Sequence, residues 1–190
     1  DKWESFANYW RKTQLEYTWL RSLMGRHKDF WQITEDSLDK SMHAFNIDGS
    51  MKNELLDLYK ILSPYPEVKE TLNKLKEKKY KLAILSNGTP ALLNELVRSN
   101  GLQNLFDDIF SVEEVKIYKP SSKVYDMPVK KYNIKKEDAA FLSANTWDVS
   151  GGGNYGFSSI WVNRNNNIFD NLDYIPKNEI SGLNQLLDIL

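Results

Sequence analysis

The hydrophobic pattern of this chain changes at Pro64, and the change limits the folds that are open to it. Before Pro64, apolar residues recur three or four positions apart, as Trp3 and Phe6 do. After it, short apolar runs alternate with amphipathic segments, a pattern typical of a parallel sheet with helices on both faces. The sequence therefore predicts an all-helical block over residues 1–63 and an α/β unit over residues 64–190, the size of a core domain with a small cap.

Turn and breaker residues divide these two blocks into elements. In the first block, apolar spacing predicts three helices, which lie around residues 3–24, 38–45 and 51–62. In the second block, apolar runs predict four buried strands, at residues 80–85, 108–112, 139–143 and 157–162. Three amphipathic segments of this block are predicted helices. One lies at residues 68–75, before the first strand, one opens at Pro90, and one lies at 121–132. Residues 180–190 are expected to form a closing helix.

The composition excludes several classes of function. The chain has no cysteine, which excludes disulfides, a thiolate zinc site and a cysteine nucleophile. Its two histidines, His27 and His43, disfavour a polyhistidine metal site. A formal net charge of −1 gives no electrostatic reason to expect binding to nucleic acid or to a membrane surface. We expect a cytoplasmic protein whose native start lies upstream of Asp1, since the sequence does not begin with Met.

Polar side chains gather where predicted strands end, and parallel sheets place their ligand sites at that edge. Residues 86–88, Ser-Asn-Gly, fit either a turn with a helix cap or a hydroxyl and an amide that face an anion. Lys119 stands in a loop, and Tyr125 comes six positions after it. Lys119 could be a solvated surface residue, or it could be a cation that keeps a carboxylate in the site ionised.

Residues 143–148 form the most specific of these polar groups. A buried strand that ends in small polar residues, with an acid five positions later, is not needed for packing. Within it, Trp147 also fits a core position, and Asp148 also fits a helix cap. The three glycines at 151–153 predict a loose helix start and therefore a less firmly held Asp148.

These groups stand in the order, spacing and strand context of the second, third and fourth motifs of the haloacid dehalogenase superfamily. The chain resembles the L-2-haloacid dehalogenases in particular, over nearly its whole length. The segments that carry the resemblance are Trp10-Arg11, Gln14 to Met24, Leu82 to Gly88, Tyr118-Lys119-Pro120, Val124-Tyr125, Ser143 to Asp148 and Trp161 to Arg164. The resemblance implies a Rossmann-type parallel-sheet core with an N-terminal helical cap.

In that family an aspartate displaces halide from C2 of a haloacid and forms an ester, which water then hydrolyses. The resemblance implies that Arg11 and Asn87 bind the departing halide, because developing negative charge needs positive and N–H donors. It also implies an apolar wall around the substrate carbon, formed by Leu15, Phe30 and Trp147.

The same resemblance assigns roles to the remaining polar residues. Ser86 is expected to bind the substrate carboxylate. Lys119, with Ser143 nearby, is expected to hold the nucleophile ionised. Three residues are expected to position or activate the hydrolytic water, namely Tyr125, Asn145 and Asp148, with Asp148 as the base.

The nucleophilic aspartate has no counterpart within the 190 residues. In the family it ends a strand that precedes the cap and lies at the centre of the sheet. Asp48 has no apolar strand before it, and Asp107 and Asp108 precede a strand instead of following one. Without a central strand, both neighbours would leave backbone groups unpaired, at ~1–3 kcal/mol for each buried group. We therefore expect the aspartate and its strand, a unit of about 20–30 residues, upstream of Asp1.

The expected activity is the hydrolysis of short L-2-haloalkanoic acids to D-2-hydroxy acids. One alternative is a phosphatase of the same superfamily, and another is a non-catalytic binding protein. Magnesium-dependent phosphatases need several carboxylates, whereas Ser143 and Asn145 stand at the early positions of the fourth motif, so no metal or cofactor is expected. The expected partners are a small haloacid, halide and a second copy in a homodimer, because the helical block is rich in aromatic residues and methionine.

Overall fold

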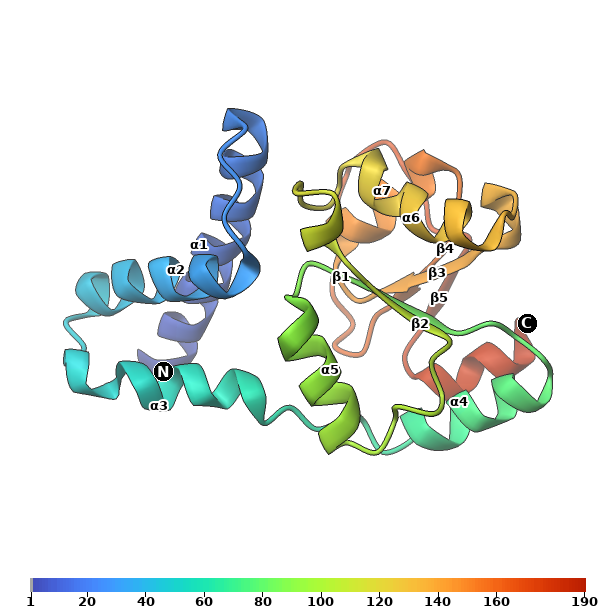
Figure 1. Cartoon of the computed structure of the whole chain (residues 1–190), viewed down its shortest axis with the longest axis horizontal. Helices are drawn as coiled ribbons and strands as arrows, with labels where there is room; N and C mark the ends of the chain where they lie inside the picture. Colours follow the sequence, from blue (N-terminus) through green and yellow to red (C-terminus); the bar gives the residue numbers. More distant parts are fainter. Residues whose placement is uncertain (1) are drawn as a thin grey trace.

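The computed structural model describes residues 2–190, which form two lobes (Figure 1). The first lobe is helical, as predicted. Its elements are α1 (Lys2–Met24), α2 (Phe30–Phe45), the 3₁₀ turn η1 (Gly49–Met51), α3 (Lys52–Asp57) and the 3₁₀ turn η2 (Leu58–Lys60).

Polar residues mark the ends of α2. The Asp29 carboxylate accepts a hydrogen bond from the Gln32 backbone N–H at 2.9 Å and begins the helix. Asn46 takes the left-handed backbone conformation that ends it. Asp48 then caps η1 by accepting a bond from the Ser50 N–H at 2.8 Å. Asp48 is therefore a turn residue, as its sequence context predicts.

The helical lobe packs around an apolar cluster contributed by α1, α2 and α3. The buried members of this cluster are Phe6, Trp10, Leu38, Met42 and Leu56. Polar side chains are buried beside it, between α1 and α2, and both Gln14 and Thr34 are 0% exposed. A buried amide and hydroxyl require partners, and these two residues provide them for each other.

The second lobe alternates helices and strands, which confirms the predicted α/β class. Its helices are α4 (Val68–Glu77), α5 (Pro90–Ser99), α6 (Ser122–Tyr132) and α7 (Thr146–Tyr155). Its strands are β1 (Ala83–Ser86), β2 (Asp108–Ser111), β3 (Ala140–Ser143), β4 (Ser158–Val162) and β5 (Asn178–Ile180). The helices α6 and α7 lie on one side of the strands, and α4 and α5 lie on the other (Figure 1).

The strands form two separate parallel sheets. β1 pairs with β2, from Ala83 opposite Asp108 to Ser86 opposite Ser111. β3, β4 and β5 form the second sheet in that order. Within residues 2–190, β1 and β3 each have a partner on one edge only.

A slot of about 400 Å³ separates the two sheets. Side chains of β1 and β3 line it from opposite sides, together with apolar residues of the helices and the C-terminal end. Ala83 and Ala140, which begin these two strands, are exposed, although strands in the middle of an α/β sheet are normally buried on both faces. We call this space the strand slot.

The lobes are joined at the turn between α1 and α2. The Tyr118 hydroxyl donates to the Lys28 carbonyl at 2.6 Å, and the Tyr118 N–H donates to the Ser22 hydroxyl at 3.2 Å. His27 stacks on the Tyr118 ring and its Nε2 lies 2.9 Å from the Glu113 carboxylate. Because Tyr118 directly precedes Lys119, these contacts tie the helical lobe to the loop that carries a predicted site residue.

The predicted closing helix over residues 180–190 is confirmed in part. Its first residue ends β5, which pairs with β4, and the 3₁₀ helix η5 (Leu183–Asp188) follows. Extended pairing prevails at Ile180 because the outer edge of β4 is open to it and Ile180 packs beside Ile160 and Val162. None of the helices within residues 2–190 is both long and apolar enough to cross a membrane.

Candidate active site

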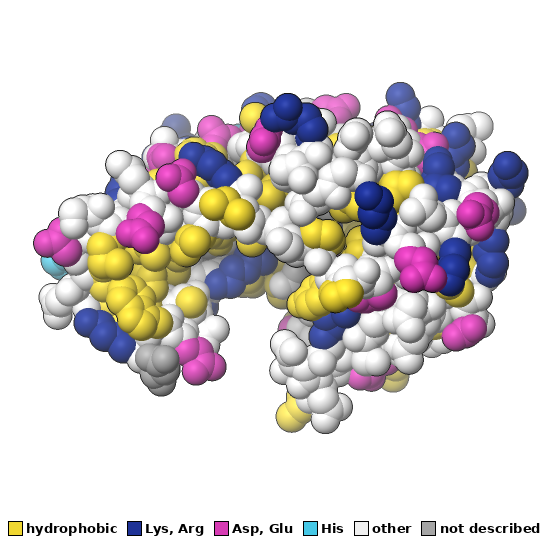
Figure 2. Space-filling model, turned by 90° about the horizontal axis from the view of Figure 1, so that it is seen from below, with side chains coloured by type: hydrophobic (Ala, Val, Ile, Leu, Met, Phe, Trp, Pro, Cys, Tyr) yellow, Lys and Arg dark blue, Asp and Glu magenta, His cyan; other side chains and the backbone are white. Residues whose placement is uncertain are grey.

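A cleft of about 450 Å³ lies between the helical lobe and the carboxyl ends of β1 and β3. The hollow between the two lobes is visible in Figure 2. Most of the sequence-predicted side chains line this cleft: Arg11, Phe30, Ser86, Asn87, Lys119, Ser143, Asn145, Trp147 and Asp148. Leu15 and Tyr125 do not line it.

The two serines that end β1 and β3 make the same local turn. The Ser86 hydroxyl accepts a hydrogen bond from the Gly88 N–H at 3.0 Å, and the Ser143 hydroxyl accepts one from the Asn145 N–H at 3.2 Å. Each hydroxyl acts as an acceptor in this turn, so its own proton can be donated to a ligand in the cleft. Thr89 then caps α5, which begins at Pro90 as predicted.

The floor of the cleft holds a buried ion pair. The Lys119 ammonium lies 3.0 Å from one carboxylate oxygen of Asp148, and the Tyr125 hydroxyl donates to the other at 2.8 Å. Lys119 also lies over the Phe141 ring. Burial, and then the negative charge of Asp148, hold the pKa of Tyr125 far above its ordinary value. Tyr125 therefore stays protonated and holds Asp148 from behind the cleft.

The glycines after Asp148 do not loosen α7, so that expectation was wrong. The helix is regular from Thr146 to Tyr155, and Asp148 is 4% exposed. Asp148 also does not cap the helix, because it lies within the first turn and Asn145 occupies the cap position. A Cβ atom on Gly151 would lie 2.5 Å from the Tyr125 hydroxyl, so this glycine gives Tyr125 room to approach Asp148.

Two donors face the cleft from opposite lobes. Arg11 extends from α1 and lines the cleft, where part of its side chain stays exposed to solvent. The surrounding cleft walls desolvate the guanidinium and lower its pKa, and the nearby Tyr59 opposes this shift. The Asn87 carbonyl oxygen accepts a bond from the Lys119 N–H at 3.3 Å, which leaves the amide N–H₂ group available to an anion. A guanidinium and an amide N–H₂ group are suitable ligands for a halide ion.

Trp147 belongs to the cleft wall and also packs like a core residue. It is half-buried and meets Trp19 of α1 edge to face, with ring centroids 5.5 Å apart. Phe30, at the start of α2, is 8% exposed and faces the same cleft. Together they provide an apolar surface between the two donors and the polar floor.

Sequence reasoning missed several residues of the cleft. Tyr59 and Leu62 line it from the end of the helical lobe, and Leu92 and Leu96 line it from α5. Their apolar spacing identified them as helical residues but could not show which side faces a ligand. Gln14 was also missed, although its position three residues after Arg11 on a helix places the two side chains on one face.

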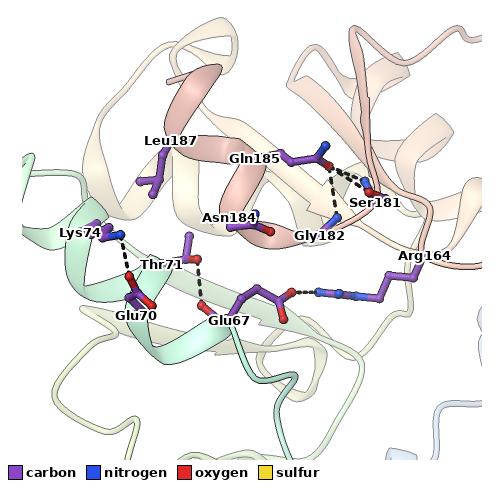
Figure 3. A pocket seen from close by; sticks show the side chains of 10 residues that line it. All are labelled: Glu67, Glu70, Thr71, Lys74, Arg164, Ser181, Gly182, Asn184, Gln185 and Leu187. Atoms are coloured by element: carbon purple, nitrogen blue, oxygen red, sulfur yellow. Dashed lines mark hydrogen bonds and ion pairs between the residues drawn. The ribbon is translucent and has the colours of Figure 1, made fainter.

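A more polar pocket, of about 630 Å³, lies between α4 and η5 (Figure 3). Its charges already neutralise one another, since Arg164 pairs with Glu67 and Lys74 pairs with Glu70. Glu67 also accepts the Leu183 N–H at 3.2 Å. These bonds attach the C-terminal segment to α4, so we interpret the pocket as structural. Within residues 2–190, no three His, Asp or Glu side chains are grouped in a way that could hold a metal ion.

The chain is similar to known proteins over nearly its whole length. The sequence pattern of the family described as haloacid dehalogenase-like hydrolase matches residues 4–162. (S)-2-haloacid dehalogenase 1 of Pseudomonas sp. (strain CBS-3) is 38% identical over 189 residues, which cover 98% of this chain and 83% of that protein. An (S)-2-haloacid dehalogenase of Pseudomonas sp. (strain YL) is 38% identical over 182 residues, which cover 95% of this chain and 78% of that one.

The fold gives the same result. The L-2-haloacid dehalogenase from Xanthobacter autotrophicus, solved with chloropropionic acid covalently bound, superimposes with a TM-score of 0.90 at 30% identity. The match covers 98% of this chain and 85% of that structure. This likeness agrees with the parallel-sheet core and helical cap that the sequence of this chain predicts. The chain thus belongs to the haloacid dehalogenase-like hydrolase family, in which it is similar to the (S)-2-haloacid dehalogenases.

Proposed function

We propose that the cleft hydrolyses the carbon–halogen bond of short L-2-haloalkanoic acids and releases halide and a D-2-hydroxy acid. One observation carries the proposal. The same cleft contains the N–H donors of Arg11 and Asn87, which suit a halide ion, and a buried Lys119–Asp148 pair. The names of the similar dehalogenases support this substrate class. In this proposal residues 1–63 act as a cap over a core of residues 64–190.

The first step is a displacement at C2. A carboxylate oxygen attacks this carbon, the carbon–halogen bond breaks, and the halide leaves with the bonding electrons. Arg11 and Asn87 stabilise the negative charge that develops on the halogen. Ser86 holds the substrate carboxylate, while Phe30 and Trp147 shield the reacting carbon from water. Attack opposite the leaving group inverts C2.

The second step is hydrolysis of the ester at its carbonyl carbon. A water molecule attacks this carbon while Asp148 takes one of its protons, and Asn145 orients the water. The bond between the carbonyl carbon and the substrate oxygen then breaks. The hydroxy acid leaves with the proton that Asp148 took from the water. The second proton of the water is released from the enzyme carboxyl group to solvent, which restores the carboxylate. Lys119 keeps the local charge balanced throughout because it lies within 3.0 Å of Asp148.

The strand slot supports a specific source for the attacking carboxylate. One parallel strand between β1 and β3 would pair the open edge of each and fill the apolar space. Because parallel strands end at the same edge of a sheet, its last residue would lie in the cleft between Ser86 and Ser143. We infer that this strand ends in the nucleophilic aspartate, which the Lys119 ammonium would hold ionised.

The experiment is an assay of the product of the complete reading frame. Chloride release should be measured with L- and with D-2-chloropropionate, in buffer with and without EDTA. The proposal predicts release from the L isomer only, with inversion at C2. Release from both isomers, or from neither, would contradict it. Phosphate release from a phosphate ester, with magnesium and without any chloride release, would favour the phosphatase alternative instead.

We also propose that the protein is a homodimer whose subunits meet through α1. Leu20, Leu23 and Met24 at the end of this helix are exposed, and Leu23 is 84% exposed. A second copy of the same surface would cover these side chains. Light scattering after gel filtration should give twice the chain mass, and Leu23→Asp should give the monomer. A monomeric unmodified protein would contradict the assignment.

A further inference from the structure

We propose that Gln14 and Thr34 are positioning residues that fix the direction of the Arg11 guanidinium in the cleft. The inference rests on the proposed function in one respect, because it takes Arg11 as the group that binds halide. It adds that Arg11 requires an uncharged hydrogen-bond acceptor as its neighbour. It also identifies the residues that hold this acceptor in place.

The contacts form a continuous chain between two walls of the cleft. The Arg11 Nη1 donates to the Gln14 Oε1 at 2.6 Å, and the Gln14 Nε2 donates to the Thr34 Oγ1 at 2.7 Å. The Thr34 hydroxyl in turn donates to the Phe30 carbonyl at 2.7 Å. Arg11 and Phe30 both line the cleft, so the chain connects the halide donor on α1 with the apolar wall on α2.

The orientation of the Gln14 amide follows from the number of protons available. The Thr34 hydroxyl has one proton, which it gives to the Phe30 carbonyl. Its oxygen can therefore only accept from Gln14, so the amide must turn its N–H₂ group toward Thr34. The carbonyl oxygen of Gln14 then has to face Arg11. The Tyr59 hydroxyl, which also lines the cleft, lies 3.4 Å from the same oxygen.

The amide also suits the charge that Arg11 has to supply. A carboxylate at position 14 would neutralise the guanidinium, and a second anion would then bind less well beside it. A neutral amide oxygen holds the guanidinium by a charge-assisted hydrogen bond and leaves its positive charge available to the halide. Both Gln14 and Thr34 are 0% exposed, so water cannot take over either role.

Packing of α1 against α2 has other sources, which separates positioning from a purely structural role. The Trp10 indole N–H donates to the Thr34 backbone carbonyl at 3.1 Å, and this bond does not use the Thr34 side chain. Phe6, Trp10, Leu38 and Met42 provide the apolar contact between the helices. Substitutions at the Thr34 hydroxyl should therefore affect the cleft more than the packing of the lobe.

The test measures bromide binding to the folded protein. Binding is monitored by the quenching of tryptophan fluorescence, because Trp147 lines the cleft. Gln14→Glu should weaken bromide binding about tenfold near neutral pH, because the new carboxylate neutralises part of the positive charge on the Arg11 guanidinium. Its affinity should recover relative to the unmodified protein as acid protonates the new carboxyl group. A purely structural role for Gln14 would not produce this pH-dependent recovery.

The Thr34 variants form a matched pair. Thr34→Val keeps the shape but removes the hydroxyl, so the amide can turn and present N–H₂ to Arg11; bromide affinity should fall several-fold. Thr34→Ser keeps the hydroxyl and should stay within about twofold of the unmodified protein, since the same two hydrogen bonds can form. Thermal unfolding is measured alongside to confirm that each variant is folded.

Arg11→Ala separates the two possible failures. If Arg11→Ala abolishes bromide binding while Gln14→Glu and Thr34→Val bind normally, the positioning proposal is wrong and the halide assignment stands. If Arg11→Ala binds bromide as well as the unmodified protein does, the halide assignment itself fails. The proposal is supported only when Gln14→Glu and Thr34→Val both weaken binding and Thr34→Ser does not.

Discussion

The cleft and the strand slot are both hollow, but their walls differ in kind. The cleft combines apolar side chains with charged groups, and each charged group is held by a named partner: Lys119 by Asp148, Asp148 by Tyr125, and Arg11 by Gln14. Mostly apolar side chains and two open strand edges line the slot. The cleft therefore contains groups that bind and stabilise charge, whereas the slot has the properties of a place for another strand.

This difference indicates that the attacking carboxylate and the groups that assist it come from different parts of the fold. Groups that stabilise a leaving halide or activate water can be attached to helices and loops around the cleft. The attacking carboxylate must approach C2 from the side opposite the leaving group, and the end of a central strand is a fixed position for it.

The largest effect is expected at Arg11. Arg11→Ala should lower chloride release from L-2-chloropropionate by about 10²-fold or more, because the leaving charge loses its cation. Initial rates from a chloride electrode provide the measurement. Arg98→Ala is the control, because Arg98 is exposed and pairs only with a neighbour on α5. Equal rates for the Arg11 and Arg98 variants would remove Arg11 from the mechanism.

The buried pair should dominate the stability of the cleft floor. Lys119→Met leaves the Asp148 carboxylate without its cation, and a buried charge that loses its partner costs ~3–5 kcal/mol. Urea unfolding of the 190-residue chain measures the free energy directly. Adding Asp148→Asn should recover part of the loss, because the unpaired charge is then gone.

Lys130→Met is the matched control for this pair. Lys130 forms an ion pair with Asp126 on the exposed face of α6, where such pairs contribute less than ~1 kcal/mol. Similar losses for Lys119→Met and Lys130→Met would mean that the floor of the cleft is not rigidly organised by charge.

Gly151→Ala should produce an intermediate effect. The new methyl group would lie 2.5 Å from the Tyr125 hydroxyl and 2.7 Å from the Pro120 Cβ, so Tyr125 must shift. We expect a loss of ~1–3 kcal/mol, which is typical of an overpacked core, and a larger relative loss of turnover than of substrate affinity. Gly49→Ala serves as the control, since no atom lies within 4 Å of its added methyl group. If Gly151→Ala and Gly49→Ala lose the same free energy of unfolding, the close packing of Tyr125 against Asp148 does not contribute to stability.

The smallest effect on stability is expected at the amino end of β1, where Asp107 is bound. Asp107 accepts the Leu82 N–H at 2.8 Å and pairs with Lys76, and these contacts lower its pKa to about 2. A carboxyl group whose folded pKa is depressed stabilises the protein above its unfolded pKa of about 3.9, and this contribution is lost as pH falls toward 2. Asp107→Asn should therefore flatten the stability profile between about pH 4 and pH 2.

Urea midpoints measured at several pH values test this prediction. Asp57→Asn is the control, because the Asp57 carboxylate is exposed and pairs only with Lys60. An unchanged acid slope in Asp107→Asn would mean that Asp107 does not anchor the amino end of β1.

Sequence reasoning predicted the α/β class, the helical cap and most of the side chains that line the cleft. It succeeded because strand ends such as Ser86 and Ser143 must lie at one edge of a parallel sheet. It failed where tertiary contacts decide the local structure. Residues 183–188 do form a helix of the 3₁₀ type, but the free edge of β4 recruits residues 178–180 as a strand that sequence reasoning did not predict.

The glycines after Asp148 show the same limit. A local rule predicts that three glycines loosen a helix, but at Gly151 the glycine is required by the approach of Tyr125 from another helix. The bond between Gln14 and Thr34 spans 20 positions in the sequence, so no local pattern could reveal it. Such partners become visible only when α1 and α2 are packed together.

The most direct test of the central claim is to fuse an apolar strand that ends in aspartate, with a linker, to the N-terminus of the 190-residue chain. Far-ultraviolet circular dichroism and urea unfolding first show whether the strand increases stability, as pairing of both slot edges requires. Chloride release from L-2-chloropropionate is then measured. We predict release with the aspartate and none with asparagine in its place, at equal stability. A stabilised aspartate fusion that releases no chloride would contradict the account.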